Sequence, residues 1–133
     1  MSNRIVHFEI HAKDQDKVQK FYQDVFGWEF QDMGAAMGNY RLIITGKDAE
    51  GTQWPGINGG MNERKGDLPK SGDAVNAYVC TIDVENIEET LSKIEKAGGT
   101  LATHVMDVPG VGKLAYRKDP EGNLFGVLEA EKK

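Results

Sequence analysis

The stretch IVHFEIHAKDQDKVQKFYQDVFGW, residues 5–28, contains the pattern that decides the fold of this chain. In residues 5–11, apolar and polar side chains alternate and β-branched side chains are frequent, which predicts a β-strand. Successive residues of a strand point to opposite faces, so His7, Glu9 and His11 are expected to share one face. These three side chains are our first candidates for the lining of a small-molecule pocket.

A helix is expected directly after this strand, from about residue 14 to residue 26. Its apolar residues recur at spacings of three and four, which is typical of a helix with one buried face; they are Val18, Phe21, Tyr22, Val25 and Phe26. Gly27 follows at the position where a helix commonly ends in a left-handed residue. The strand residues Phe8 and Ile10 lie on the face opposite to His7 and are expected to pack under this helix.

The order strand, helix, glycine and three strands then occurs twice along the chain. In the first half, the three strands are expected from residue 28, at 40–45 and at 57–61. The second half has a strand at 76–84, a helix at about 86–97, and strands at 100–105, 113–117 and 124–129, the last two joined by a turn signature at 119–123. The pattern predicts a single domain of two βαβββ modules, at about residues 4–62 and 75–131, with a linker at about 63–74.

The composition argues against several classes of protein. The 133 residues carry 16 Lys and Arg against 21 Asp and Glu, a net charge of −5, which disfavours binding to nucleic acid or to an anionic membrane surface. No apolar run approaches the ~20 residues of a membrane-spanning helix, and residues 1–6 lack the apolar core of a signal peptide. Cys80 is the only cysteine, so an intrachain disulfide is excluded and a cytoplasmic location is expected.

Some single residues have both a structural and a functional interpretation. Cys80 is expected to be a small core residue that faces the second helix, because the residues at 78 and 82 are apolar. Trp28, Trp54 and Tyr40 fit either a packed core or a surface that stacks on the ring of a ligand. Glu129 is three residues beyond Gly126 in the last strand, so these two residues are expected to point to opposite faces.

Residues from both halves resemble the glyoxalase/bleomycin-resistance/extradiol-dioxygenase superfamily, the vicinal oxygen chelate proteins. The resemblance rests on His7-Phe8-Glu9-Ile10, Phe21-Tyr22 and Phe26-Gly27-Trp28, and on Ile87, Leu91, Ile94, Ala97-Gly98-Gly99 and Asp119-Pro120-Glu121-Gly122-Asn123. It implies an α+β fold in which two βαβββ modules form a cup-shaped, mostly antiparallel sheet with the helices outside. It also implies a homodimer and a small-molecule ligand held in the concave surface.

Enzymes of that superfamily hold one divalent metal ion with side chains at four strand positions, two in each module. The resemblance places the first position on His7 and the second within residues 56–61, where Asn58 is the only polar side chain. The third falls near Val79 and the fourth on Gly126. His7 is therefore the one candidate metal ligand, and the implied divalent metal cofactor lacks three of its four expected ligands.

Two functions are consistent with these residues. The first is a protein that binds a small molecule in a concave pocket without a metal, with His7, Glu9, His11 and Asn58 as pocket residues. The alternative is a divalent-metal-dependent lyase, isomerase or dioxygenase that uses His7. The sequence identifies neither the ligand nor a catalytic residue.

Overall fold

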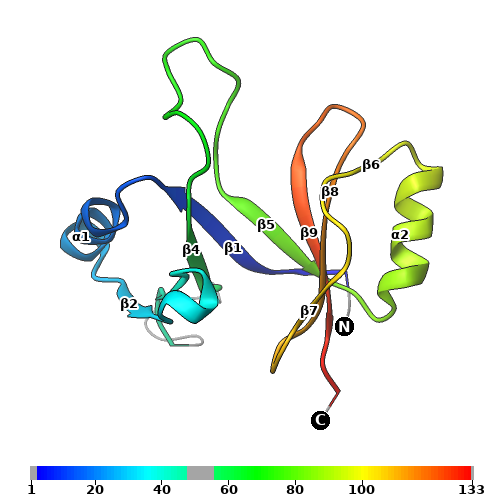
Figure 1. Cartoon of the computed structure of the whole chain (residues 1–133), viewed down its shortest axis with the longest axis horizontal. Coiled ribbons are helices and arrows are strands. Elements are labelled where there is room, and N and C mark those ends of the chain that lie inside the picture. The colour runs from blue at the N-terminus through cyan, green and yellow to red at the C-terminus, as the bar shows by residue number, and fades with distance from the viewer. Residues whose placement is uncertain (1–2, 48–55, 133) are drawn as a thin grey trace. The chain divides into compact units, whose positions relative to one another are not determined.

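The computed structural model describes residues 3–47 and 56–132 of the chain (Figure 1). The chain divides into two compact units, one formed by His7–Tyr78 and the other by Met1–Val6 together with Val79–Lys133. We refer to residues 7–78 as the first unit and to the remainder as the second unit. Strand β1 (Ile5–Ala12) begins in the second unit and continues in the first.

The first unit contains one α-helix and a sheet built from β1 and three further strands in its described residues. Its elements in chain order are β1, α1 (Gln15–Phe26), β2 (Glu29–Asp32), a short 3-10 helix (Ala35–Met37), β3 (Arg41–Ile44) and β4 (Gly59–Glu63). The strands lie in the order β2-β3-β4-β1, with β1 and β4 parallel and the other neighbours antiparallel. This arrangement is the predicted succession of strand, helix and three strands.

Helix α1 begins and ends where the sequence predicts. The carboxylate of Asp14 accepts a hydrogen bond from the backbone N–H of Lys17, and Gly27 is left-handed with φ of 72°. No residue of α1 is fully buried, however, and the side chains of Val25 and Phe26 are 57% and 59% exposed. The apolar face predicted for α1 is therefore only partly covered.

An aromatic cluster joins α1 to the sheet of the first unit. The ring of Tyr22 lies nearly parallel to that of Trp28 with centroids 4.9 Å apart, and Phe8 stacks on Tyr78 at 5.3 Å. The hydroxyl groups of Tyr22 and Tyr78 are 2.8 Å apart. Phe8 and Ile10 are both buried, so this face of β1 packs under the helix as predicted. Trp28 belongs to the packed cluster, whereas Trp54 lies outside the described residues.

The second unit repeats the arrangement of the first. Its further elements are β5 (Val79–Asp83), α2 (Ile87–Lys96), β6 (Thr100–Leu101), β7 (Met106–Val108), β8 (Gly112–Lys118) and β9 (Leu124–Ala130). β5 and β9 are parallel, β8 and β9 are antiparallel, and both β6 and β7 pair with β8 in the antiparallel sense. Each unit is thus α+β with a mostly antiparallel sheet, which confirms the predicted fold class.

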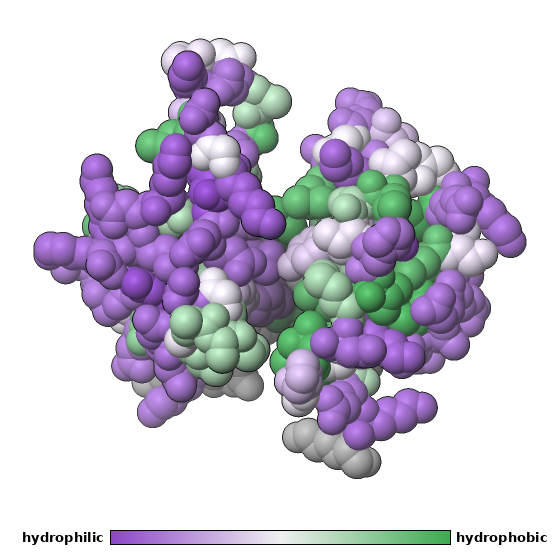
Figure 2. Space-filling model, in the orientation of Figure 1, coloured by the Kyte–Doolittle hydropathy of each residue, from purple (hydrophilic) through white to green (hydrophobic). Residues whose placement is uncertain are grey.

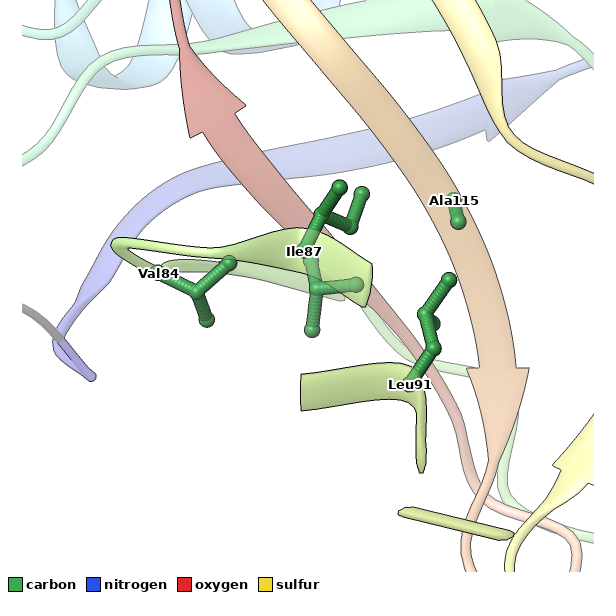
Figure 3. Close-up of a cluster of buried hydrophobic side chains, with 5 residues drawn as sticks. Val84, Ile87, Leu91 and Ala115 are labelled. Carbon is green, nitrogen blue, oxygen red and sulfur yellow. The ribbon is translucent and has the colours of Figure 1, made fainter. Parts of the chain in front are cut away.

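The core of the second unit lies between α2 and the strands (Figure 3). Its buried side chains are Val84, Ile87, Leu91, Ala115 and Val127. Ile82 of β5 packs against this cluster. Cys80 shares that face of β5 by strand alternation and is half-buried, which agrees with its expected place facing the helix.

Of the segment expected to form one strand at 100–105, only β6 at 100–101 is a strand, and a second short strand, β7, follows at 106–108. Both pair with β8, but their registers differ by two residues. Between them, the N–H groups of Ala102 and Thr103 both donate to the carbonyl of Tyr116, which is the hydrogen-bond pattern of a bulge. The residue types in this segment all suit a strand, so their composition alone does not reveal the bulge.

The turn at 119–123 joins β8 to β9 as predicted. The carboxylate of Asp119 accepts hydrogen bonds from the backbone N–H groups of Glu121 and Asn123 and from the side-chain amide of Asn123. These hydrogen bonds, above all the one from the Asn123 side chain, lower the pKa of Asp119 below its usual range. Gly122 has φ of 88°, a conformation that favours glycine.

The two units differ in the surface that each presents in Figure 2. Over α2, β8 and β9, green apolar atoms gather, and the exposed apolar residues of the second unit include Leu101, Met106, Val111 and Leu124. The visible face of the first unit is largely hydrophilic. Neither α-helix in the described part of the chain has the length and apolar character that crossing a membrane would need.

Candidate functional site

The polar side chains of β1 lie beside β4 in the first unit. The two strands are parallel, with Glu9 opposite Gly60 and His11 opposite Asn62. Because side chains alternate along a strand, His7, Glu9 and His11 lie on the face that points away from α1. We call this surface, formed by the three β1 residues with Gly60 and Asn62 of β4, the polar face.

His7 is hydrogen-bonded to Tyr40, which directly precedes β3. The Nε2 atom of His7 lies 2.8 Å from the hydroxyl oxygen of Tyr40. This hydroxyl fills the space that a side chain at residue 60 would need, because a Cβ atom on Gly60 would lie only 1.7 Å from it. Glycine at residue 60 therefore allows Tyr40 to reach His7.

Burial decides the protonation of this pair. It lowers the pKa of His7 below its usual value of 6.5, and the negative charge of Glu9 opposes this effect only in part. Burial, followed by the charge of Glu9, also raises the pKa of Tyr40. Both groups are consequently neutral near pH 7, so they form a neutral hydrogen bond whose direction depends on the tautomer of His7.

Glu9 supplies a buried carboxylate to the polar face. Its side chain is 7% exposed, and its Oε2 atom accepts a hydrogen bond of 3.0 Å from the side-chain amide of Asn62. Its Oε1 atom lies 3.9 Å from Nε2 of His11. These neighbours offset part of the free energy that burial of a carboxylate costs. The polar face thus combines an imidazole, a phenol, an amide and a carboxylate.

Asn58, the fourth predicted pocket residue, makes its contacts at the end of β3. Its Oδ1 atom accepts hydrogen bonds from the backbone N–H of Thr45 at 2.9 Å and from the Thr45 hydroxyl at 3.2 Å. The structure therefore brings His7, Glu9 and His11 together on one face, whereas the side chain of Asn58 is turned towards Thr45.

Tyr40 and Asn62 belong to the polar face although the sequence does not single them out as pocket residues. The expected strand at 57–61 ends one residue before Asn62. For Tyr40, the sequence allows either a place in the core or a role in stacking on a ligand. The signal that could have found them is the pair Gly59-Gly60 within a strand, since strand glycines often mark a site where another group approaches closely.

The last strand of the second unit agrees with the predicted directions of its side chains. Gly126 pairs with Thr81, and a Cβ atom on Gly126 would lie 3.0 Å from the Thr81 hydroxyl and 3.2 Å from the ring of Tyr116. Glu129 points to the helix side, where its Oε1 atom accepts a hydrogen bond of 2.9 Å from the backbone N–H of Ile87. Gly126 and Glu129 therefore face opposite ways.

These residues do not fit the metal site that the resemblance implies. Within residues 3–47 and 56–132, no group of three or more His, Cys, Asp or Glu side chains could hold a metal ion. His7 is bound to Tyr40, and the side chains of Val79 and Gly126 contain no ligand atom. The donor set of the described residues thus departs from that of the superfamily's metal enzymes.

The sequence is similar to a bleomycin-resistance-like family model and to proteins named as glyoxylases. Residues 4–46 match the family model described as bleomycin resistance protein-like N-terminal. A protein of Mycobacterium bovis named as a glyoxylase, CFP32, is 30% identical over 122 residues, which are 91% of this chain and 42% of that protein. A glyoxylase-like domain-containing protein of Didymella fabae is 29% identical over 130 residues, 96% of this chain and 94% of that protein.

Solved structures have the same fold. A glyoxalase/bleomycin resistance protein/dioxygenase superfamily member from Vibrio splendidus has a TM-score of 0.59 at 19% identity, covering 95% of this chain and 97% of that one. A methylmalonyl-CoA epimerase of Streptomyces coelicolor has a TM-score of 0.65 at 15% identity, covering 99% of this chain and all of that one.

The chain is similar to proteins of the glyoxalase/bleomycin resistance/dioxygenase superfamily, the vicinal oxygen chelate proteins, and has their fold. Its more specific relationships are to proteins named as glyoxylases, and it spans less than half the length of the mycobacterial one.

Proposed function

We propose that the chain binds a small organic molecule at the polar face of its first unit, without holding a metal ion. The observation that carries this proposal is the Tyr40 hydroxyl, which fills the space beside Gly60 and is hydrogen-bonded to His7. A metal ion on the Nε2 atom of His7 would have to displace Tyr40. An organic ligand, in contrast, would hydrogen-bond to the imidazole, the phenol and the Asn62 amide as they stand.

The charges around the polar face favour a neutral or cationic ligand. Glu9 is a buried carboxylate, whereas His7 and Tyr40 are neutral near pH 7, so an anion at this face would be repelled. The net charge of −5 acts in the same direction over a longer range. The match to a bleomycin-resistance-like family model makes metal-free bleomycin a suitable first ligand to test.

Calorimetric titration with metal-free bleomycin, in the presence of a chelator, tests the proposal. We expect saturable binding that Tyr40→Phe weakens about tenfold, because the variant loses one buried hydrogen-bonding group. His104→Gln, at an exposed residue of the second unit, is the matched control and should bind as the unchanged protein does. If bleomycin does not bind, small polar molecules are screened by NMR, again with a chelator present. A ligand from this screen should also bind more weakly to Tyr40→Phe. Ligands that bind only with added zinc, or equally to Tyr40→Phe, would contradict the proposal.

The alternative function is a metal-dependent enzyme of the superfamily that uses His7, and the glyoxylase names of the relatives favour it. A glyoxalase reaction needs a metal ion with open coordination positions and a base. With the hemithioacetal of methylglyoxal and glutathione as substrate, we expect no turnover above background after addition of zinc, nickel or cobalt. Turnover that disappears with a chelator and with His7→Ala would establish the alternative and overturn our proposal.

A homodimer and a cytoplasmic location are part of the same proposal. Support for the dimer comes from the exposed apolar side chains of α1, since contiguous apolar surface commonly marks an interface. Support for the location comes from the single cysteine, Cys80.

A further inference from the structure

A cavity of about 550 Å³ lies in the first unit between α1, the end of β1 and residues 64–78. Ile10 and Ala12 of β1 line it, and by strand alternation these residues point away from the polar face. The cavity therefore lies on the helix side of β1, and it adjoins the polar face at His11, which also lines it. Its volume lies within the ~300–1,000 Å³ of small-molecule sites.

The apolar part of the cavity wall is preformed but not covered. Phe21 and Tyr22 of α1 line it together with Leu68 and Tyr78 of the facing segment. The hydrogen bond of 2.8 Å between the Tyr22 and Tyr78 hydroxyl groups joins the two sides. Phe21 and Leu68 are nevertheless 55% and 58% exposed, so a ligand in this cavity would remove apolar surface from water.

Cationic groups accompany this apolar wall. Of the described residues, Lys13, Lys17 and Arg64 supply the positive charge of the lining, and Asp14 is the acidic residue among them. The carboxylate of Asp14 already accepts a hydrogen bond from the backbone N–H of Lys17. Lys13 is 3.8 Å from Asp67, an exposed pair that is weakened by solvent. The local charge is thus positive although the whole chain carries −5.

Arg64 is the most firmly held of these cations. Its two terminal nitrogen atoms donate to the side chain of Asn76, at 3.1 Å, and to the backbone carbonyl of His11, at 2.9 Å. Its Nε atom is buried and has no hydrogen-bond partner within the described part of the chain. Because Nε is not accessible to solvent, Arg64 acts on a ligand in the cavity through the positive charge of its guanidinium group.

We propose that this cavity is a second binding site, which takes an organic anion with an apolar body, such as a medium-length carboxylate. The apolar body lies against Phe21, Tyr22 and Leu68, and the carboxylate lies near Lys17 and Arg64. This preference is opposite in charge to that of the polar face, where the buried carboxylate of Glu9 disfavours anions.

Octanoate, with octanol as its neutral match, is the probe for this site. Titration is followed by NMR on the full chain, with the methyl resonances of Val18 and Leu68, which line the cavity, as local reporters. We expect saturable shifts of these resonances, and an affinity for octanoate at least fivefold above that for octanol. Equal affinity for the two compounds, or shifts confined to residues outside the cavity, would overturn the proposal.

Two pairs of variants separate the site from general effects on the protein. Leu68→Glu adds a negative charge to the cavity and should weaken octanoate binding at least tenfold, whereas Val75→Glu, at a 95% exposed residue outside the lining, should leave it unchanged. Lys17→Gln should weaken binding about threefold, and Lys20→Gln, on the same helix but outside the lining, should not. All four residues are exposed, so the variants are expected to fold. Equal effects within both pairs would refute the site, and loss of binding in Tyr40→Phe would show that octanoate occupies the polar face instead.

Discussion

At the scale of single residues, the absence of a side chain at Gly60 leaves the space that the Tyr40 side chain occupies. The Tyr40 hydroxyl lies where the Cβ atom of residue 60 would be, and from there it reaches His7. A larger residue at 60 and a tyrosine at 40 therefore exclude each other. The same contact gives the Nε2 atom of His7, the one histidine of the expected metal site, a hydrogen-bond partner within the protein.

Gly60→Ala should lower the free energy of unfolding by about 1–3 kcal/mol, because the new methyl group forces Tyr40 away. In a Tyr40→Ala background the same substitution should cost much less, since the space is then empty. Urea unfolding of the double-mutant cycle measures the coupling. Gly46→Ala is the control, because nothing lies within 4 Å of a Cβ atom there. Equal costs of Gly60→Ala in both backgrounds would show that Tyr40 does not need this space.

The lowered pKa of His7 predicts a pH dependence of stability. The unfolded chain binds a proton at this residue near pH 6.5, but the folded chain does so only at lower pH. The free energy of unfolding should therefore fall as the pH drops below 6.5, and its full value should be present above that pH.

Urea unfolding at about pH 7.5 and about pH 5.5 compares the protein with His7→Gln, which keeps a hydrogen-bonding group near Tyr40. The variant should lose less stability over this interval than the unchanged protein, by up to about 1 kcal/mol. His104→Gln, at an exposed residue, should behave as the unchanged protein does. A His7→Gln variant with the same pH dependence would contradict the assignment.

At the scale of elements, α2 is tied to its sheet mainly through Ile87. This side chain is fully buried in the cluster with Val84, Leu91 and Ala115, and its backbone N–H is bound by Glu129 of β9 (Figure 3). Ile87→Ala should lower the free energy of unfolding by about 2–5 kcal/mol, because it leaves a cavity between helix and sheet. Leu101→Ala, at a residue that is 55% exposed, should change it by less than about 0.5 kcal/mol. Similar losses for the two variants would place the core elsewhere.

Local sequence signals were sufficient to predict where the helices begin, but not the extent of every strand. Both helices begin near the predicted residues, after Asp14 and Asn86, whose side chains accept hydrogen bonds from backbone N–H groups in the first turn. The strand expected at 100–105 was wrong in its extent, because β6 and β7 are separated by a bulge against β8. A bulge depends on the register between two strands, and the pattern within one strand does not contain that register.

At the scale of the whole molecule, the apolar face of α1 bears on the proposed dimer. Light scattering during gel filtration should give a mass twice that of one chain. Val25→Glu, at a 57% exposed residue of α1, should shift the protein towards the monomer, whereas Val75→Glu should not. A monomeric unchanged protein, or a dimer that Val25→Glu leaves intact, would remove α1 from the interface.

What the sequence by itself determined is the order of the elements, the caps of the helices and the faces of β1, because each depends on residues a few positions apart. Only the tertiary structure determines which side chains the residues on those faces contact. His7 meets Tyr40 across 33 positions of the chain, and Glu9 meets Asn62 across 53. Such contacts depend on how β1, β3 and β4 lie beside one another. The periodicity of a single strand predicts the side on which His7 lies, but the partner that it meets there is set by the packing of distant segments.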